Sequence, residues 1–279
     1  QDIADYIGDS LALAQIAAKL DNARMIVLCG VHFMGETAKV LCPDKKVLIP
    51  DINAGCSLAD SCPADKFAEF VAAHPDHTVI SYVNTSIGVK ALTDVLVTSG
   101  NARKIVDTFP ADAKLIFGPD RNLGNYINSV TGRNMLLWDG ACHVHEEFSV
   151  EKIAELKKQH PQAKVLVHPE CKRPLQLMAD VIGSTAVLLK YAVESDDTEF
   201  IVATESGILH QMQKSCPDKT FIPAPPNDST CGCNDCRYMK LNTMEKLYNC
   251  LKFEQPEIIV DPELAEKARR PIERMLELS

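Results

Sequence analysis

The sequence has no excess of positive charge, and this shortage limits its possible partners. Lysine and arginine total 29 against 38 aspartates and glutamates, which gives a net charge of −9. Proteins that bind nucleic acid need a basic surface for the phosphates, so the composition argues against a nucleic acid partner. Small anionic substrates are not excluded, because a local cluster of hydrogen-bond donors is enough to bind them.

Long apolar runs and nucleotide-binding motifs are also lacking. No apolar run approaches the roughly 20 residues that a membrane-spanning helix requires. Neither a Walker phosphate-binding pattern nor a G-x-G-x-x-G pattern is present. The opening residues, QDIADYIGDS, are acidic and lack the basic region that begins a secretory signal peptide. We therefore expect a cytoplasmic protein that does not bind membranes.

Cysteine, by contrast, is plentiful, with 11 residues in the chain. In a chain without secretory features, clustered cysteines indicate metal or redox chemistry rather than a disulfide framework. Cys231, Cys233 and Cys236 lie together in CGCNDCRYMKLNT. This segment could hold zinc with one further histidine or cysteine, form a Cys233–Cys236 redox dithiol, or supply one corner of a larger site.

Short apolar runs alternate with longer helical patterns along the whole chain. The runs are MIVLCG, VLIP, TVISYV, KLIFG, MLLW, KVLVH, EFIVA and TFIPA. Strands that are apolar almost throughout are typical of a parallel sheet covered on both faces. The sequence therefore predicts an α/β fold.

The chain also contains an internal repeat. CPDKKVLIP (42–50) nearly matches CPDKTFIPA (216–224), and ADYIGDSLALAQIA (4–17) matches ADVIGSTAVLLKYA (179–192). A third copy begins at TDVLVTSGNARKIV (93–106). The aligned aspartates Asp5, Asp94 and Asp180 are 89 and 86 positions apart, so we expect three homologous αβα units.

The repeat length sets the expected domain boundaries. Residues 1–73, 74–160 and 161–240 form the three αβα units, and residues 241–279 form helices that pack back on the first unit. We expect the parallel sheets of the three units to be arranged about a pseudo-threefold axis.

One cysteine stands at the equivalent place in each unit, just past its last strand. Cys56, Cys142 and Cys236 are 86 and 94 positions apart, which matches the repeat, although Cys231 and Cys233 fit the third place almost as well. Loops at the carboxyl ends of strands are where α/β folds bind ligands. Around a pseudo-threefold axis, three such thiolates can converge.

Three converging thiolates favour zinc or an iron–sulfur cluster over magnesium or calcium. On a cubane cluster they leave one iron without a protein ligand, and this iron can act as a Lewis acid in dehydration chemistry. The other cysteines are expected to be small buried residues, namely Cys29, Cys42, Cys62, Cys171, Cys216 and Cys250.

Two polar pairs are expected to face these cysteines. Tyr82 and Asn84 end the first strand of the second unit, and His168 and Glu170 end the first strand of the third. Each pair begins 12 residues before the aligned aspartate of its unit. In the first unit the equivalent strand would lie upstream of residue 1, so we expect roughly ten or more residues to precede this sequence.

Each unit also has a hydroxyl residue after its short second strand, just before a helical pattern. These residues are Ser10, Ser99, and Ser184 with Thr185. They are expected to cap the helices, and helix N-termini aimed at one centre would also bind the carboxylates and phosphate of a substrate.

The motifs GDSL, AGCSLAD, YVNT, GPDRNLG, HPEC, ATESGILHQMQK, CPDKTFIPAP and CRYMKLNT together resemble the quinolinate synthase family, in the right order over essentially the whole chain. The resemblance implies three αβα domains and a central [4Fe–4S] cluster held by Cys56, Cys142 and Cys236. It selects Cys236 over Cys231 and Cys233. The family's His-x-Tyr pair on a first strand is missing from this sequence.

The resemblance also implies an activity in de novo NAD biosynthesis. The family condenses iminoaspartate with dihydroxyacetone phosphate to quinolinate, with loss of phosphate and two waters. This links it to the aspartate oxidase or dehydrogenase that produces iminoaspartate. Glu170 would be the base, His168 would position substrate or move protons, and Tyr82 would orient the intermediate. The substrate-binding residues would be Ser10, Tyr82, Asn84, Ser99, His168, Glu170 and Thr185.

Two other functions fit parts of the pattern. A different cluster-dependent hydro-lyase would share the open iron but act on another hydroxy acid. A non-enzymatic zinc-binding or cluster-sensing protein would use only the C-terminal cysteines, so its metal would survive replacement of Cys56 or Cys142 by serine.

Overall fold

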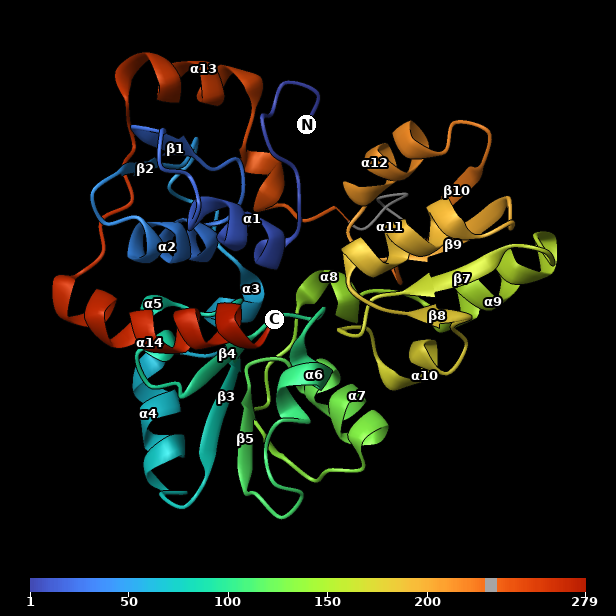
Figure 1. Ribbon diagram of the computed structural model, residues 1–279. Helices are drawn as coiled ribbons and strands as arrows, with labels where there is room; N and C mark the ends of the chain where they lie inside the picture. The colour runs from blue at the N-terminus through green and yellow to red at the C-terminus, as the bar shows by residue number, and fades with distance from the viewer. Residues whose placement is uncertain (229–234) are drawn as a thin grey trace. The chain divides into compact units, whose positions relative to one another are not determined.

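The computed structural model describes residues 1–228 and 235–279. It confirms the predicted α/β fold, because the named strands form three sheets in which every pairing is parallel. The chain forms two compact units (Figure 1). Unit 1 comprises residues 1–140 and 237–279, and unit 2 comprises residues 141–236.

Unit 1 contains two of the sheets. The smaller pairs β1 (Met25–Val27) with β2 (Lys46–Leu48). The larger has the order β4-β3-β5-β6. Its strands are β3 (Thr78–Tyr82), β4 (Val95–Val97), β5 (Leu115–Gly118) and β6 (Leu136–Leu137).

Unit 2 contains the third sheet, which has the order β10-β9-β7-β8. Its strands are β7 (Lys164–Val167), β8 (Val181–Ile182), β9 (Glu199–Ala203) and β10 (Thr220–Pro223). In both four-stranded sheets the first strand in the chain is flanked by the second and the third, and the fourth lies beyond the third. The two sheets therefore have the same topology, as expected for two copies of one sequence pattern.

Equivalent side chains in these two sheets make equivalent hydrogen bonds. The carboxylate of Asp94 accepts a hydrogen bond from the backbone N–H of Val79 at 2.8 Å, and that of Asp180 accepts one from Val165 at 2.8 Å. Each aspartate thus ties the start of its second strand to the first strand of the sheet. The charge on the acceptor makes each bond stronger than a neutral one.

Unit 1 contains helices before, between and after its strands. They are α1 (Ser10–Ala17), α2 (His32–Leu41), α3 (Ser57–Asp60), α4 (Ala64–Ala72), α5 (Ile87–Lys90), α6 (Ala102–Val106), α7 (Arg121–Thr131), the 3₁₀ turn η1 (Met239–Leu241), α13 (Met244–Phe253) and α14 (Pro262–Leu278). The helices of unit 2 are α8 (His143–Glu146), α9 (Val150–Gln159), α10 (Arg173–Gln176), α11 (Thr185–Glu194) and α12 (Ile208–Ser215).

The C-terminal segment completes unit 1. The backbone N–H of Ile258 donates to the carbonyl of Val47 in β2 at 2.7 Å, so the chain after α13 runs beside the smaller sheet. Figure 1 shows α14 passing between α2 and the larger sheet, and α14 contacts α2, α5 and β4. The expected domain boundaries stay a prediction.

The core lies between the sheets and their helices. Central-strand side chains such as Ile80, Phe117 and Phe200 are fully buried, and each such side chain contributes about 1.5–3 kcal/mol of transfer free energy. This burial fixes the strands, and with them the loops at their carboxyl ends. In the part of the chain that the structure describes, no helix combines the length and apolar character needed to cross a membrane.

Candidate functional site

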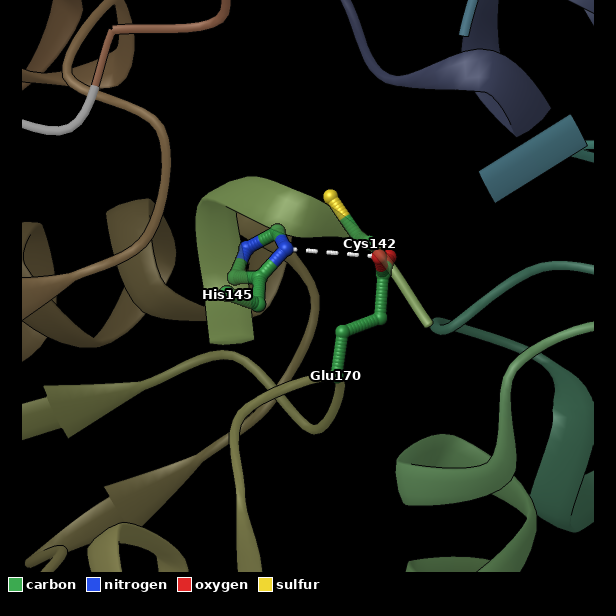
Figure 2. Close-up of side chains that lie close together, drawn as sticks. All are labelled: Cys142, His145 and Glu170. Carbon is green, nitrogen blue, oxygen red and sulfur yellow. Dashed lines mark ion pairs between the residues drawn. The ribbon is translucent and has the colours of Figure 1, made fainter. Parts of the chain in front are cut away.

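Unit 2 brings a thiol, an imidazole and a carboxylate together. Cys142 is the residue before α8, His145 lies on α8, and Glu170 follows β7. One ligand atom from each side chain lies within 4.8 Å of the other two, and Figure 2 shows the three side chains converging. Nδ1 of His145 is 3.3 Å from Oε2 of Glu170. We call these three residues the Cys142 cluster.

The imidazole and the carboxylate of the cluster are almost fully buried, with 7% of His145 and 3% of Glu170 exposed. Nε2 of His145 is 3.1 Å from the hydroxyl of buried Thr204, which follows β9. This contact fixes the ring so that Nδ1 faces the carboxylate.

His168 packs against the same group. Its ring stacks on that of His145 with centroids 4.7 Å apart, and its Nδ1 is 3.5 Å from Oε1 of Glu170. Nδ1 accepts a hydrogen bond from the backbone N–H of Glu170 at 3.4 Å, so the proton of the neutral ring is on Nε2. Burial lowers the pKa of His168 to about 3, against the opposing effect of Glu170, so the ring is neutral at pH 7.

Cys236 is tied to the third sheet through Glu205, which follows β9. Oε1 of Glu205 accepts a hydrogen bond from the backbone N–H of Cys236 at 3.2 Å, and Oε2 accepts one from Gly207 at 2.7 Å. Cys231 and Cys233 lie outside the described residues.

Exposure separates the three expected ligand cysteines from those of the core. Cys56, Cys142 and Cys236 are partly exposed. Five of the six cysteines expected in the core are buried, namely Cys42, Cys62, Cys171, Cys216 and Cys250. The prediction for Cys29 was wrong: it is exposed, because β1 ends at Val27 and Cys29 lies in the loop that follows.

Unit 1 places the first polar pair at the end of β3. Tyr82, its last residue, is 5% exposed. Among the described residues, Oδ1 of Asn84 and Oγ1 of Thr98 are buried without a hydrogen-bond partner. These atoms follow the adjacent strands β3 and β4. Buried polar atoms are normally satisfied, so this edge of the sheet is suited to a polar ligand.

Two buried charged side chains contact the turn that carries Asn84. Lys90 is fully buried, and its ammonium donates to the carbonyl of Thr85. Glu36 accepts a hydrogen bond from the backbone N–H of Ile87 at 3.1 Å. Burial lowers the pKa of Lys90 to about 8, opposed by the charges of Glu36 and Cys56. The turn is thereby held from both sides, and a positive charge is placed near Cys56.

The hydroxyl residues that precede the helices differ in whether they cap them. Ser184 caps α11, with its Oγ accepting from the backbone N–H of Val187 at 3.4 Å, and Thr185 is the first residue of that helix. The expectation that Ser10 and Ser99 cap their helices was wrong. Asp9 caps α1, because a carboxylate stands one residue earlier. Ser99 lies in a turn ahead of α6.

The structure therefore brings Cys142, His168 and Glu170 together in unit 2, and sets Tyr82, Asn84 and Ser99 at adjacent strand ends in unit 1. The sequence analysis missed several residues of these sites, namely His145, Thr204, Glu205, Thr98 and the Lys90–Glu36 pair. His145 could have been found, since a residue three positions after a ligand on a helix lies on the same face. The others meet the sites only through tertiary packing.

Comparisons with known proteins identify the family of the chain. The family model for quinolinate synthetase A protein matches residues 1–277. Quinolinate synthase from Synechococcus sp. is 57% identical over 279 residues, which is 100% of this chain and 87% of the relative. The quinolinate synthases of Thermosynechococcus vestitus and Chloroherpeton thalassium are 58% and 56% identical, again over 100% of this chain and over 87% and 86% of theirs.

The match is thus continuous across both units, and the identity is far above what shared fold alone would require. It covers the residues of the Cys142 cluster and those at the end of β3. The chain belongs to the quinolinate synthase family.

Proposed function

We propose that the chain condenses iminoaspartate with dihydroxyacetone phosphate to quinolinate, releasing phosphate and two waters. As a member of its family it is an enzyme of NAD biosynthesis. The observation that carries the detailed proposal is the buried Glu170 carboxylate, set between two histidines and beside Cys142.

The cofactor in this proposal is one [4Fe–4S] cluster per chain, held by Cys56, Cys142 and Cys236. The donor set fits such a group. These three thiols are partly exposed on loops beyond the last strands, whereas the core cysteines are buried, and thiolates are the ligands that iron–sulfur clusters prefer. When bound, the cluster supplies an open iron as a Lewis acid for the loss of hydroxyl groups. The pseudo-threefold arrangement of the αβα units belongs to the same proposal.

Glu170 is the general base in this proposal. Its carboxylate takes a proton from a carbon next to a carbonyl or imine during enolisation and ring closure. His145, with its Nδ1 3.3 Å from Oε2, orients the carboxylate. A base held in this way contributes about 10²- to 10⁴-fold to a rate.

His168 acts as a hydrogen-bond donor. Its Nδ1 is occupied by the Glu170 N–H, so the Nε2–H is the group that can donate to a carbonyl or hydroxyl oxygen of the substrate. Because burial keeps the ring neutral, His168 can donate this bond without adding a positive charge beside Glu170.

The remaining residues bind and orient the substrates. Tyr82 and Asn84 contact the intermediate, and the orphan oxygen of Asn84 accepts a hydrogen bond from its amine or hydroxyl groups. Ser10, Ser99 and Thr185 bind carboxylate or phosphate oxygens. Thr185 is the best placed for an anion, because it opens the ten-residue helix α11.

The partners follow from the substrates. Two small anions bind, and an aspartate oxidase or dehydrogenase supplies iminoaspartate. Nucleic acids and membranes are not partners, and the enzyme acts in the cytoplasm. The domains are residues 1–73, 74–160 and 161–240, followed by the helices of 241–279.

The proposal is tested by anaerobic assay of the reconstituted protein with enzymatically generated iminoaspartate and dihydroxyacetone phosphate. Mass spectrometry should detect quinolinate and a colorimetric assay should detect equimolar phosphate. Release of water from a hydroxy acid without formation of quinolinate would refute the proposed reaction. It would instead favour a different cluster-dependent hydro-lyase.

A further inference from the structure

We propose that the chain binds one zinc ion through Cys142, His145 and Glu170 when its iron–sulfur cluster is not assembled. The site lies within unit 2 and needs no residue of unit 1. It uses one of the expected cluster ligands together with two side chains that do not hold the cluster.

The geometry of the three ligand atoms suits a tetrahedral ion. Zinc binds sulfur at about 2.3 Å, imidazole nitrogen at about 2.0–2.1 Å and carboxylate oxygen at about 2.0–2.2 Å. Tetrahedral angles then put the ligand atoms about 3.2–3.7 Å from one another. Nδ1 of His145 and Oε2 of Glu170 are already 3.3 Å apart, and all three ligand atoms lie within 4.8 Å of one another. To complete the shell, the Sγ of Cys142, which Figure 2 shows beside the other two ligand atoms, has to move toward them.

The surroundings orient the imidazole as in established zinc sites. A metal-bound histidine usually donates its second ring N–H to a neighbouring oxygen. In this site Nε2 of His145 is 3.1 Å from the Thr204 hydroxyl, which leaves Nδ1 for the metal. Both His145 and Thr204 are buried, with 7% and 5% exposed. The imidazole is therefore oriented before any ion arrives.

The donor set selects the ion. One thiolate, one imidazole and one carboxylate match zinc, which accepts all three ligand types, whereas magnesium and calcium prefer oxygen alone. Three protein ligands leave the fourth position for water.

The consequence for the enzyme rests on the proposed function. One Sγ of Cys142 cannot serve both zinc and the cluster, so a bound zinc ion prevents cluster assembly, and it also occupies the carboxylate of the base. Zinc would therefore hold the chain in an inactive form that assembles its cluster only after the ion has left.

The test is zinc binding to cluster-free protein, purified with chelator under reducing conditions and titrated with Zn²⁺ alone. Wild type should bind one zinc per chain. His145→Ala and Glu170→Gln should weaken binding at least tenfold, and Thr204→Val should weaken it by about tenfold or more because the imidazole loses its orienting partner. His143→Ala, which removes a second histidine from α8, is the matched control and should leave zinc affinity unchanged.

Cys56→Ser and Cys236→Ser separate the inference from the proposed function. Both should retain zinc, and both should lose the cluster after reconstitution. Absence of zinc from wild type, unchanged affinity in His145→Ala, or loss of zinc in Cys56→Ser would each overturn the zinc site. A cluster that persists in Cys56→Ser would instead refute the proposed cofactor and leave the zinc result standing.

Discussion

Glu170→Gln is the substitution that bears most directly on the proposed chemistry. The amide has the same shape as the carboxylate but cannot accept a proton. The side chain is 3% exposed and lies 3.3 Å from His145 and 3.5 Å from His168, so water has little room to take over the role. We expect turnover to fall by about 10²- to 10⁴-fold, which is about 3–5 kcal/mol of transition-state stabilisation.

The assay measures initial rates of quinolinate formation at saturating substrate, with the visible spectrum and iron content recorded on the same samples. The cluster signal should be unchanged, because Glu170 is not among the three proposed cluster ligands. Michaelis constants should change much less than turnover, since the loss concerns proton transfer and not binding.

Glu146→Gln is the matched control. Glu146 lies on α8 beside the Cys142 cluster but pairs with Lys172 at 3.5 Å, and its substitution should leave turnover within about threefold of wild type. Glu170→Gln with turnover in that same range, at full cluster content, would remove Glu170 from the mechanism.

Four further predictions concern stability and reactivity. Because burial lowers the pKa of His168 from 6.5 to about 3, the unfolded state binds one more proton than the folded state between these values. The cluster-free protein should therefore lose about 1.4 kcal/mol of unfolding free energy per pH unit between about pH 6.5 and 3, and urea titrations should show a shallower loss in His168→Gln. Asp180→Ala should lower the free energy of unfolding by about 1–2 kcal/mol, because it removes the hydrogen bond to the backbone N–H of Val165. The denaturation midpoint measures this loss, and Asp5→Ala should leave the midpoint almost unchanged. Lys90→Met should lower the free energy of unfolding by about 1–3 kcal/mol because the carbonyl of Thr85 loses its buried donor, and an unchanged denaturation midpoint would contradict that role. Iodoacetamide should leave Cys62 unmodified in native protein at pH 8, since burial raises its pKa to about 12, and peptide mass spectrometry would expose any labelling that disagrees.

The strands could be read from the sequence because parallel strands are buried on both faces. Each of the eight apolar runs named in the sequence analysis overlaps a strand of the structure, and the short strands β4 and β8 lie in the repeat segments that begin near Asp94 and Asp180. The repeat placed Asp94 and Asp180 at equivalent positions, and both make the same hydrogen bond. The local pattern was therefore sufficient to locate the strands, because the burial of a strand on both faces shows in a few consecutive apolar residues.

The helix caps were harder to assign from the repeat alone. Alignment set Ser10, Ser99 and Ser184 side by side, yet only Ser184 caps its helix. Asp9 is an equally good cap one residue earlier, and α6 begins later than the pattern suggested. A cap depends on the exact dihedral angles of one residue, and several neighbouring polar residues can compete for that role.

The supporting residues of the site could not be predicted because they reach it from distant parts of the chain. Thr204 meets His145 across 59 positions, and Glu36 meets Ile87 across 51. Lys90 belongs to none of the sequence patterns considered, yet it is fully buried. Only tertiary packing shows that these side chains hold the groups that do the chemistry.

The central claim is that three cysteines from different parts of the chain hold one iron–sulfur cluster. It is tested by measuring iron, sulfide and zinc in anaerobically purified and reconstituted protein, with wild type beside Cys56→Ser, Cys142→Ser and Cys236→Ser. We predict about four irons per wild-type chain, with the broad sulfide-to-iron absorption lost in all three variants. Full iron content in Cys56→Ser or Cys142→Ser would contradict the account.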